Sequence, residues 1–160
     1  MRTPASTTAA SRDRANRMLP NPTVRMVLVE DQQADELLIR ESLALRFPDA
    51  DVTVLRDGEQ MMRWIDMIES EYAPCPDIIL LDLNLPRFRG EQVLERLRTT
   101  PRCGPVPVVI VSSSDAPTDQ AIAARLGSAR YFRKPQDYNA FMKLGDLVHD
   151  VLYSKGAAGQ

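Results

Sequence analysis

Oxygen-bearing side chains and one lysine stand at the ends of four short apolar runs in this chain. Glu30 and Asp31 follow the first run, Asp82 follows the second, Ser112 follows the third and Lys134 follows the fourth. Carboxylate oxygens are ligands that Mg²⁺ prefers. A carboxylate beside a divalent ion, a lysine and a hydroxyl donor can also act as a nucleophile toward a phosphoryl group. These residue types therefore indicate a magnesium-dependent anion site built around Asp82.

Several other chemistries are excluded by what the chain lacks. His149 is the only histidine and there is no CxxC pair, so a zinc site has no ligand set. A Ser-His-Asp site would need His149 as its base. The two cysteines, Cys75 and Cys103, make no disulfide framework, and we expect both to be free and reduced.

The runs that carry these residues alternate with segments of helical spacing. We expect strands at residues 24–29, 52–55, 78–81, 106–111 and 130–133, and helices at about 34–47, 58–68, 90–100, 116–126 and 137–153. In the fourth helix, Asp115 is predicted to be the N-cap, Pro117 to lie in the first turn and Gly127 to end the helix.

Strict alternation of strands and helices predicts an α/β fold with a parallel sheet covered on both faces. Ligands bind such sheets at the carboxyl ends of the strands. In a doubly wound sheet of order 2-1-3-4-5, the first and third strands are neighbours, so Glu30, Asp31 and Asp82 would lie within a few ångströms of one another. Because three such carboxylates repel, they require a cation. Mg²⁺ and Lys134 would supply the positive charge.

Four segments in order resemble the receiver domain of two-component response regulators. They are Glu30-Asp31, the run Asp82-Leu83-Asn84-Leu85-Pro86 with Gly90, Ser112-Ser113-Ser114, and Tyr131-Phe132-Arg133-Lys134-Pro135. The resemblance covers residues 24–155 and implies a flavodoxin-like, doubly wound, five-stranded parallel sheet of order 2-1-3-4-5. Within the family, the chain is most similar to stand-alone regulators paired with bacterial phytochrome histidine kinases.

The resemblance implies a role for each matching residue. Asp82 would accept a phosphoryl group from a phosphohistidine on a sensor histidine kinase. Asp31 and Asp82 would bind Mg²⁺ by their side chains, Asn84 would bind it by its backbone carbonyl, and Glu30 would act through a metal-bound water. Ser112 and Lys134 would contact phosphoryl oxygens, and the Tyr131 ring would turn inward to transmit the change. The Lys134–Pro135 peptide bond is often cis in this family.

The last helix has a second apolar stripe beside its core-facing one. Its members are Tyr138, Met142, His149 and Tyr153. A helix with two apolar faces often docks a second copy, so we expect a homodimer through the fourth helix, the fifth strand and the last helix. Few residues follow this helix, so we expect signalling through contact with a further, unidentified protein.

Length and charge favour a single soluble domain. The 160 residues are 44% hydrophobic and 26% charged. Residues 1–23 carry four arginines against one aspartate, which leaves a net charge of −5 on the rest. An acidic body argues against nucleic-acid binding, and no run is apolar enough for a membrane span or a secretory signal. We expect a cytoplasmic protein with a disordered extension at 1–23 and a flexible tail at 156–160.

Three alternatives share these features. A phosphate sink or relay shuttle would return its phosphoryl group to a phosphotransfer histidine. A hydrolase with an aspartyl-phosphate intermediate would turn over a phosphate ester, although the chain lacks the DxD pair and the substrate cap typical of such enzymes. A flavodoxin-like carrier would need a hydroxyl-rich phosphate loop after the first strand, which is absent.

Overall fold

Five parallel strands form one sheet at the centre of the molecule. This computed structural model describes residues 22–70 and 73–154. The strand order is β2-β1-β3-β4-β5, so the predicted doubly wound order is confirmed. The strands are β1 (Arg25–Val29), β2 (Asp51–Leu55), β3 (Ile78–Leu81), β4 (Val108–Ser112) and β5 (Arg130–Arg133).

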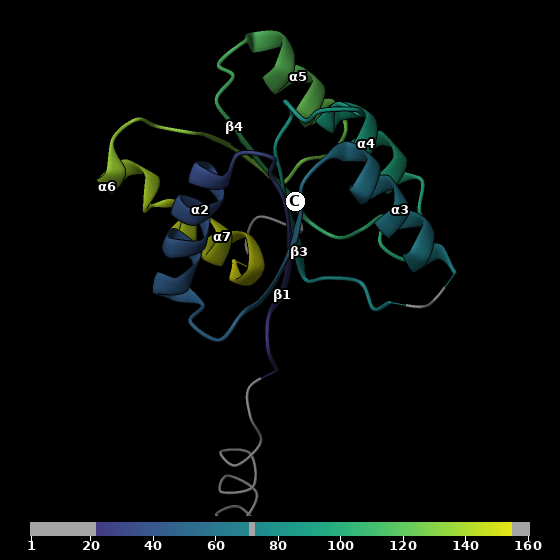
Figure 1. Ribbon diagram of the computed structural model, residues 1–160, viewed down its shortest axis with the longest axis horizontal. Helices are drawn as coiled ribbons and strands as arrows, with labels where there is room; N and C mark the ends of the chain where they lie inside the picture. Colours follow the sequence, from purple (N-terminus) through teal and green to yellow (C-terminus); the bar gives the residue numbers. More distant parts are fainter. Residues whose placement is uncertain (1–21, 71–72, 155–160) are drawn as a thin grey trace, which may run out of the picture.

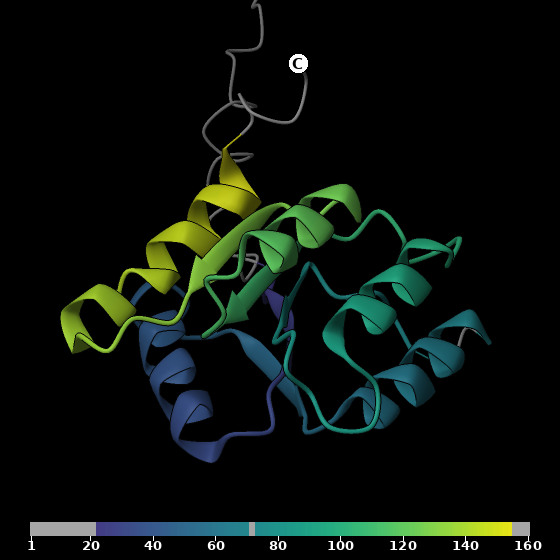
Figure 2. The ribbon, with the colours of Figure 1, turned by 90° about the horizontal axis from the view of Figure 1, so that it is seen from above.

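Helices cover both faces of the sheet, as Figures 1 and 2 show. One face carries α2 (Gln33–Arg46), α6 (Tyr138–Phe141) and α7 (Leu144–Tyr153). The other carries α3 (Gly58–Glu69), α4 (Gly90–Arg98) and α5 (Pro117–Arg125). None of the helices described has the length and hydrophobicity that crossing a bilayer requires.

Alternating side chains of the central strands fill two separate cores. In β1, Val27 and Val29 pack with α3 and α4, whereas Met26 and Leu28 pack with α2 and α7. All four residues of β3 are fully buried. A strand that is covered on both faces needs apolar side chains at every position. This requirement explains the uninterrupted Ile-Ile-Leu-Leu sequence that precedes Asp82.

The strand register brings the ends of the strands to one edge of the sheet. Val29 pairs with Leu81, so the residues that follow, Glu30 and Asp82, emerge side by side. The Asp82 N–H donates to the Val29 carbonyl at 3.1 Å. Between the neighbouring strands β4 and β5, the Lys134 N–H donates to the Ser112 carbonyl at 2.8 Å. Backbone pairing alone therefore places the four chemically active strand ends together.

The last helix is not continuous, contrary to the prediction of one helix over 137–153. It is interrupted between α6 and α7, at Met142 and Lys143. The Ser42 hydroxyl of α2 donates to the Met142 carbonyl at 2.9 Å and accepts from the Gly145 N–H at 2.8 Å. A Cβ at Gly145 would lie 2.3 Å from the Ser42 carbonyl oxygen. Because the chain packs closely on α2, Ser42 hydrogen-bonds the backbone groups that the break leaves free. The apolar pattern of a single helix does not reveal this contact.

Two further local predictions were wrong. Ala116, not Asp115, is the N-cap of α5, with Pro117 as its first helical residue, because the first carbonyl that accepts from the helix is that of Ala116, from the Asp119 and Gln120 N–H groups. The Asp115 carboxylate instead pairs with Arg133 at 3.2 Å. The Lys134–Pro135 bond is trans; the two isomers of an X-Pro bond are close in energy, so the sequence alone does not decide between them. Gly127 does follow the end of α5, and its φ of 76° suits the left-handed conformation that glycine adopts without strain.

Cys75 and Cys103 form a disulfide, so the expectation of two free thiols was wrong. The bond links the loop before β3 to the loop before β4, and the two Cα atoms are 5.6 Å apart. The cysteines are 28 residues apart in sequence, but neighbouring parallel strands bring the loops that precede them to the same edge of the sheet. Cysteine number alone could not reveal this proximity.

Reduction of the disulfide should lower thermal stability. A cross-link over a loop of this length contributes about 3.5 kcal/mol in the chain-entropy description, which corresponds to a melting temperature lower by roughly 10 °C. Calorimetry with and without a phosphine reductant measures the shift. The Cys75→Ser variant should melt at the temperature of the reduced protein and be insensitive to reductant. A wild-type melting temperature unchanged by complete reduction would contradict the expectation.

Candidate functional site

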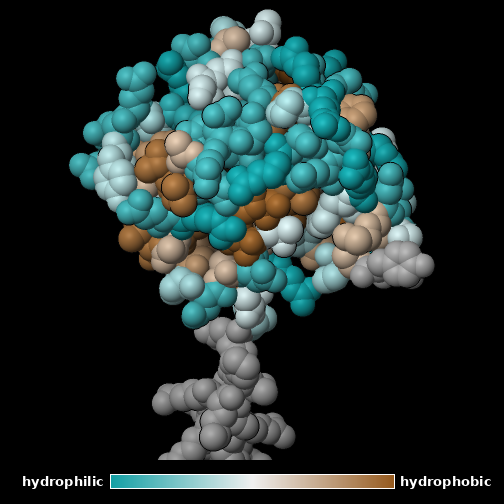
Figure 3. Space-filling model, in the orientation of Figure 1, coloured by the Kyte–Doolittle hydropathy of each residue, from teal (hydrophilic) through white to brown (hydrophobic). Residues whose placement is uncertain are grey.

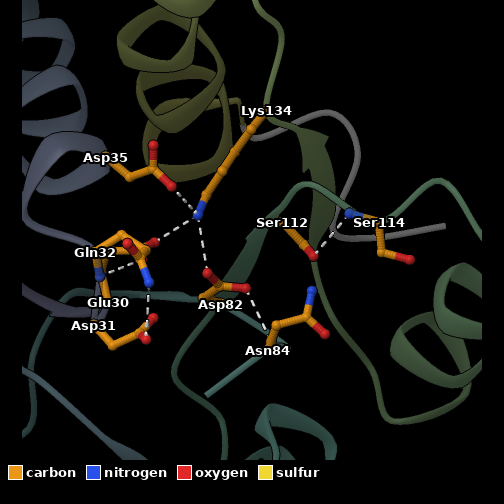
Figure 4. Close-up of polar contacts among 9 residues, drawn as sticks. All are labelled: Glu30, Asp31, Gln32, Asp35, Asp82, Asn84, Ser112, Ser114 and Lys134. Carbon is orange, nitrogen blue, oxygen red and sulfur yellow. Dashed lines mark hydrogen bonds and ion pairs between the residues drawn. The ribbon is translucent and has the colours of Figure 1, made fainter. Parts of the chain in front are cut away.

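Three carboxylates converge at the carboxyl edge of β1 and β3. Ligand oxygens of Glu30, Asp31 and Asp82 all lie within 4.8 Å of one another. Glu30 and Asp82 are buried, and Asp31 is half-buried. The structure therefore brings together the three acids that the strand order indicated (Figure 4).

Lys134 reaches into this cluster from the end of β5. Its Nζ donates to Glu30 Oε2 at 2.7 Å, to Asp35 Oδ2 at 2.8 Å and to Asp82 Oδ2 at 2.9 Å. The Lys134 side chain is only 6% exposed. Burial opposes its charge, but the hydrogen bonds to Asp35, Glu30 and Asp82 outweigh burial and raise the pKa of Lys134. The ammonium therefore stays charged and neutralises part of the cluster.

Glu30 is the carboxylate most affected by its surroundings. Burial is the largest cause, and with the nearby Asp82 charge it raises the pKa of Glu30 to about 7. Hydrogen bonds from Lys134 and from the Gln32 N–H, at 3.0 Å, act in the opposite direction. The net effect shows that one lysine does not fully compensate this group of acids. A further cation beside Glu30 would relieve the remaining cost.

Asp82 has two differently engaged oxygens. Oδ1 accepts a hydrogen bond from the Asn84 N–H at 2.9 Å, and Oδ2 accepts from Lys134. The tight turn after Asp82 packs against the start of α4, where a Cβ at Gly90 would lie 2.4 Å from the Asp82 carbonyl oxygen. A glycine is therefore required at position 90 for this turn to hold the carboxylate in place.

The hydroxyl side of the site comes from β4 and β5. Ser112 is fully buried, and its Oγ accepts from the Ser114 N–H at 3.2 Å. Tyr131 in β5 is half-buried, and its hydroxyl donates to the Ser114 carbonyl at 2.8 Å. Ser114 thus contacts both residues. Figure 4 shows Ser112 and Asn84 on one side of Asp82 and Lys134 on another.

The second stripe of the last helix lies beside α2. The Tyr138 hydroxyl donates to Glu41 of α2, and the His149 ring packs against the rings of Phe47 and Tyr153. Met142 packs against the core under α2 and α7. Tyr138 and Tyr153 remain 50% and 54% exposed. Figure 3 shows hydrophobic side chains gathered over α2 and α6, surrounded by hydrophilic ones.

Sequence reasoning missed Asp35, which contacts Lys134 from the first turn of α2. An available signal was its spacing, since Asp35 lies one helical turn beyond Asp31. Asp35 has no assigned role in the interpretation of the sequence, and acids are common near a helix start, so its residue type alone does not single it out. Its role in the site depends on the direction in which α2 leaves β1.

The donor set fits a divalent cation that prefers oxygen ligands. It offers carboxylates on two adjacent strand ends and contains no sulfur or imidazole ligand. Three protein oxygens leave room for water in an octahedral arrangement, as is usual for Mg²⁺.

The chain matches known proteins over most of its length. Residues 26–144 match the response regulator receiver domain family. The response regulator Rcp1 of Synechocystis sp. (strain PCC 6803) is 34% identical over 125 residues, which cover 78% of this chain and 85% of Rcp1.

Two crystal structures share the fold closely. The phosphorylated cyanobacterial phytochrome response regulator RcpA is 32% identical, with a TM-score of 0.74 over 82% of this chain and 95% of RcpA. The Mn²⁺-bound form of Rcp1 is 31% identical, with a TM-score of 0.71 over 79% of this chain and 92% of that chain.

Proposed function

Because this chain belongs to the response regulator receiver domain family and so acts in two-component signalling, we propose that Asp82 is its phosphoacceptor. An oxygen of Asp82 attacks the phosphorus of a phosphohistidine on a sensor histidine kinase. The P–N bond breaks, the imidazole recovers its electron pair and a proton, and an acyl phosphate forms on Asp82. The observation that carries this proposal is the placement of Asp82, a buried carboxylate held between two other acids and a lysine.

Receiver domains bind a divalent metal in an acidic pocket, and this chain has such a pocket. We propose Mg²⁺ as the ion, held by Asp31, Asp82 and the backbone carbonyl of Asn84, with Glu30 acting through a water. When bound, the ion supplies positive charge to the transferring phosphoryl group. Lys134 binds one phosphoryl oxygen, and the buried Ser112 hydroxyl donates to another.

The change in Asp82 is transmitted through Ser112 and Tyr131 in this proposal. A shift of the Ser112 hydroxyl toward the phosphoryl group breaks its contact with the Ser114 N–H. The Tyr131 hydroxyl, which now donates to the Ser114 carbonyl, loses the geometry that holds it. Its ring then turns inward and changes the surface formed by α5, β5 and the last helix.

The proposed phosphodonor is a phytochrome-type histidine kinase. RcpA, to which this chain is similar, is described as a cyanobacterial phytochrome response regulator. The similarity extends over 95% of RcpA and 82% of this chain. Phosphotransfer profiling against the sensor kinases of the host tests this assignment.

The proposed function is tested by labelling with a small phosphodonor. Acetyl phosphate with Mg²⁺ should label the chain with at most one phosphoryl group, and a chelator should prevent labelling. Turnover of a phosphate ester far beyond one equivalent would favour a hydrolase instead. Return of the label to a phosphotransfer histidine would identify a relay shuttle.

We also propose a homodimer that uses α5, β5 and the last helix. The support is the second stripe of the last helix, in which Tyr138 and Tyr153 remain half-exposed. Because these tyrosines lie beside α2, the interface should extend onto that helix. We expect a concentration-dependent mass in analytical ultracentrifugation, shifted toward monomer by Tyr153→Lys. Lys replaces an apolar ring by a charge, and Met67→Lys, which makes the same kind of change at an exposed apolar residue of α3 on the opposite face of the sheet, is the matched control. A monomer mass at all concentrations would refute the dimer.

A cytoplasmic location is the remaining part of this proposal. Disulfides are rare in reducing compartments, so in the cytoplasm Cys75 and Cys103 should be mostly free thiols and not the bonded pair of this structure. Alkylation of rapidly quenched cell extracts tests this, because only free thiols are modified. Modified cysteines support a cytoplasmic location, and unmodified cysteines contradict it.

A further inference from the structure

We propose that Asp35 is a positioning residue that competes with the phosphoryl group for Lys134 and thereby restrains phosphorylation. This inference rests on the proposed phosphoacceptor role of Asp82. Its basis is the juxtaposition of three carboxylates, from Glu30, Asp35 and Asp82, around the ammonium nitrogen of Lys134 (Figure 4).

Lys134 has no free hydrogen-bond donor in this structure. An ammonium group has three N–H donors and no acceptor. All three are engaged, by Glu30, Asp35 and Asp82, at 2.7 to 2.9 Å. Lys134 can therefore bind an incoming phosphoryl oxygen while Asp82 is still a free carboxylate only by releasing one of these partners.

Burial determines which partner is released at the lowest cost. The side chains of Glu30 and Asp82 are 0% and 6% exposed, whereas the Asp35 side chain is 29% exposed. A buried carboxylate that loses its partner keeps the full cost of desolvation, but a partly exposed one is rehydrated. Asp35 is therefore the exchangeable partner.

The surroundings of Asp35 leave space for that exchange. Asp35 and Lys134 line a hollow of about 710 Å³, together with residues of the β5–α6 connection and α6. No other partner of the Asp35 carboxylate is present among the described residues. Its carboxylate can turn into this hollow when Lys134 moves to a phosphoryl oxygen.

Charge acts in the same direction as hydrogen bonding. The Lys134 ammonium group lies between Asp35 and Asp82, at 2.8 Å from the first carboxylate and 2.9 Å from the second. A negative charge at that separation repels an incoming anion, by an amount that corresponds to roughly three- to tenfold in affinity at the dielectric of a partly exposed site. Removal of the charge should therefore favour the phosphorylated form.

The test measures the affinity for beryllofluoride, an anion that mimics the phosphoryl group, by ¹⁹F NMR at saturating Mg²⁺. Asp35→Asn and Asp35→Ala should each bind it about three- to tenfold more tightly than wild type, and Asp35→Glu, which keeps the charge, should remain close to wild type. Asp49→Asn removes the same charge from an exposed turn at the far end of α2 and is the matched control.

The outcomes separate this inference from the proposed function. A merely structural role for Asp35 would weaken both stability and anion binding, so a gain in affinity distinguishes competition from support of the fold. Unchanged or weaker binding in both the Asn and Ala variants would overturn the role of Asp35. A wild-type protein that binds no beryllofluoride would instead overturn the role of Asp82.

Discussion

The Asp82→Asn variant is expected to take up no phosphoryl group from acetyl phosphate or from a kinase. An amide oxygen is a poor nucleophile, and the side chain loses the charge that binds the metal. Removal of a nucleophile lowers the rate of covalent chemistry by on the order of a thousandfold or more. Gels that retard acyl-phosphate proteins, or mass spectrometry at neutral pH, measure the labelled fraction directly.

Two observations make this result specific to the nucleophile. In the Asp82→Asn variant the side-chain amide oxygen can still accept a hydrogen bond from Lys134 or from the Asn84 N–H, so the variant should fold, with an unchanged circular dichroism spectrum. Asp49→Asn, on an exposed turn, should be labelled as wild type. Labelling of Asp82→Asn at a level close to that of wild type would place the acceptor elsewhere, with the neighbouring Asp31 as the first candidate.

The parallel sheet and the placement of the acids at strand ends were predictable because they depend on local patterns, whereas the order 2-1-3-4-5 that makes the first and third strands neighbours came from the resemblance to receiver domains. An apolar run that ends in an acid marks both a buried strand and its carboxyl end, as Ile78 to Asp82 illustrates. Once alternating helices require parallel strands, the ends of adjacent strands must meet at one edge. Glu30 and Asp82 therefore followed from the sequence without knowledge of any side-chain contact.

The features that were missed depend on contacts between distant segments. Cys75 and Cys103 meet because β3 and β4 are adjacent, and nothing near either cysteine encodes that contact. Ser42 lies 100 residues before Met142 in the sequence, and its hydroxyl donates to the Met142 carbonyl at the break in the last helix. Asp35 joins the site only because α2 leaves β1 at an angle that directs its first turn toward Lys134. Each of these features requires the packing of helices on the sheet, which periodicity does not specify.

Lys134 should be the residue whose removal separates metal binding from phosphorylation. In Lys134→Met the phosphoryl group loses a buried positive donor, and loss of one such donor lowers rates by about 10²- to 10³-fold. Mg²⁺ affinity should instead rise, because the ion no longer competes with an ammonium group for Glu30 and Asp82. Labelling kinetics and calorimetric Mg²⁺ titration measure the two effects, and Lys143→Met, at an exposed lysine, is the control.

The Lys134→Met variant leaves Glu30 and Asp82 without their lysine partner. Its stability should therefore increase with Mg²⁺ and decrease as the pH rises. Removing one partner of a buried ion pair costs about 3–5 kcal/mol, and Mg²⁺ should restore much of this.

The folded-state pKa of Glu30, about 7, lies above its ordinary value of 4.5, so Glu30 binds its proton more tightly in the folded protein. Stability therefore falls as pH rises from about 4.5 to 7, and without Lys134, whose hydrogen bond lowers that pKa, the fall should be larger and extend to higher pH. Urea denaturation at about pH 4 and about pH 8, on either side of that range, tests this with and without Mg²⁺. Equal stability of the variant at both pH values without the metal would contradict this expectation. It would mean that the acidic cluster carries no unpaired negative charge, which is the basis for its expected affinity for a cation.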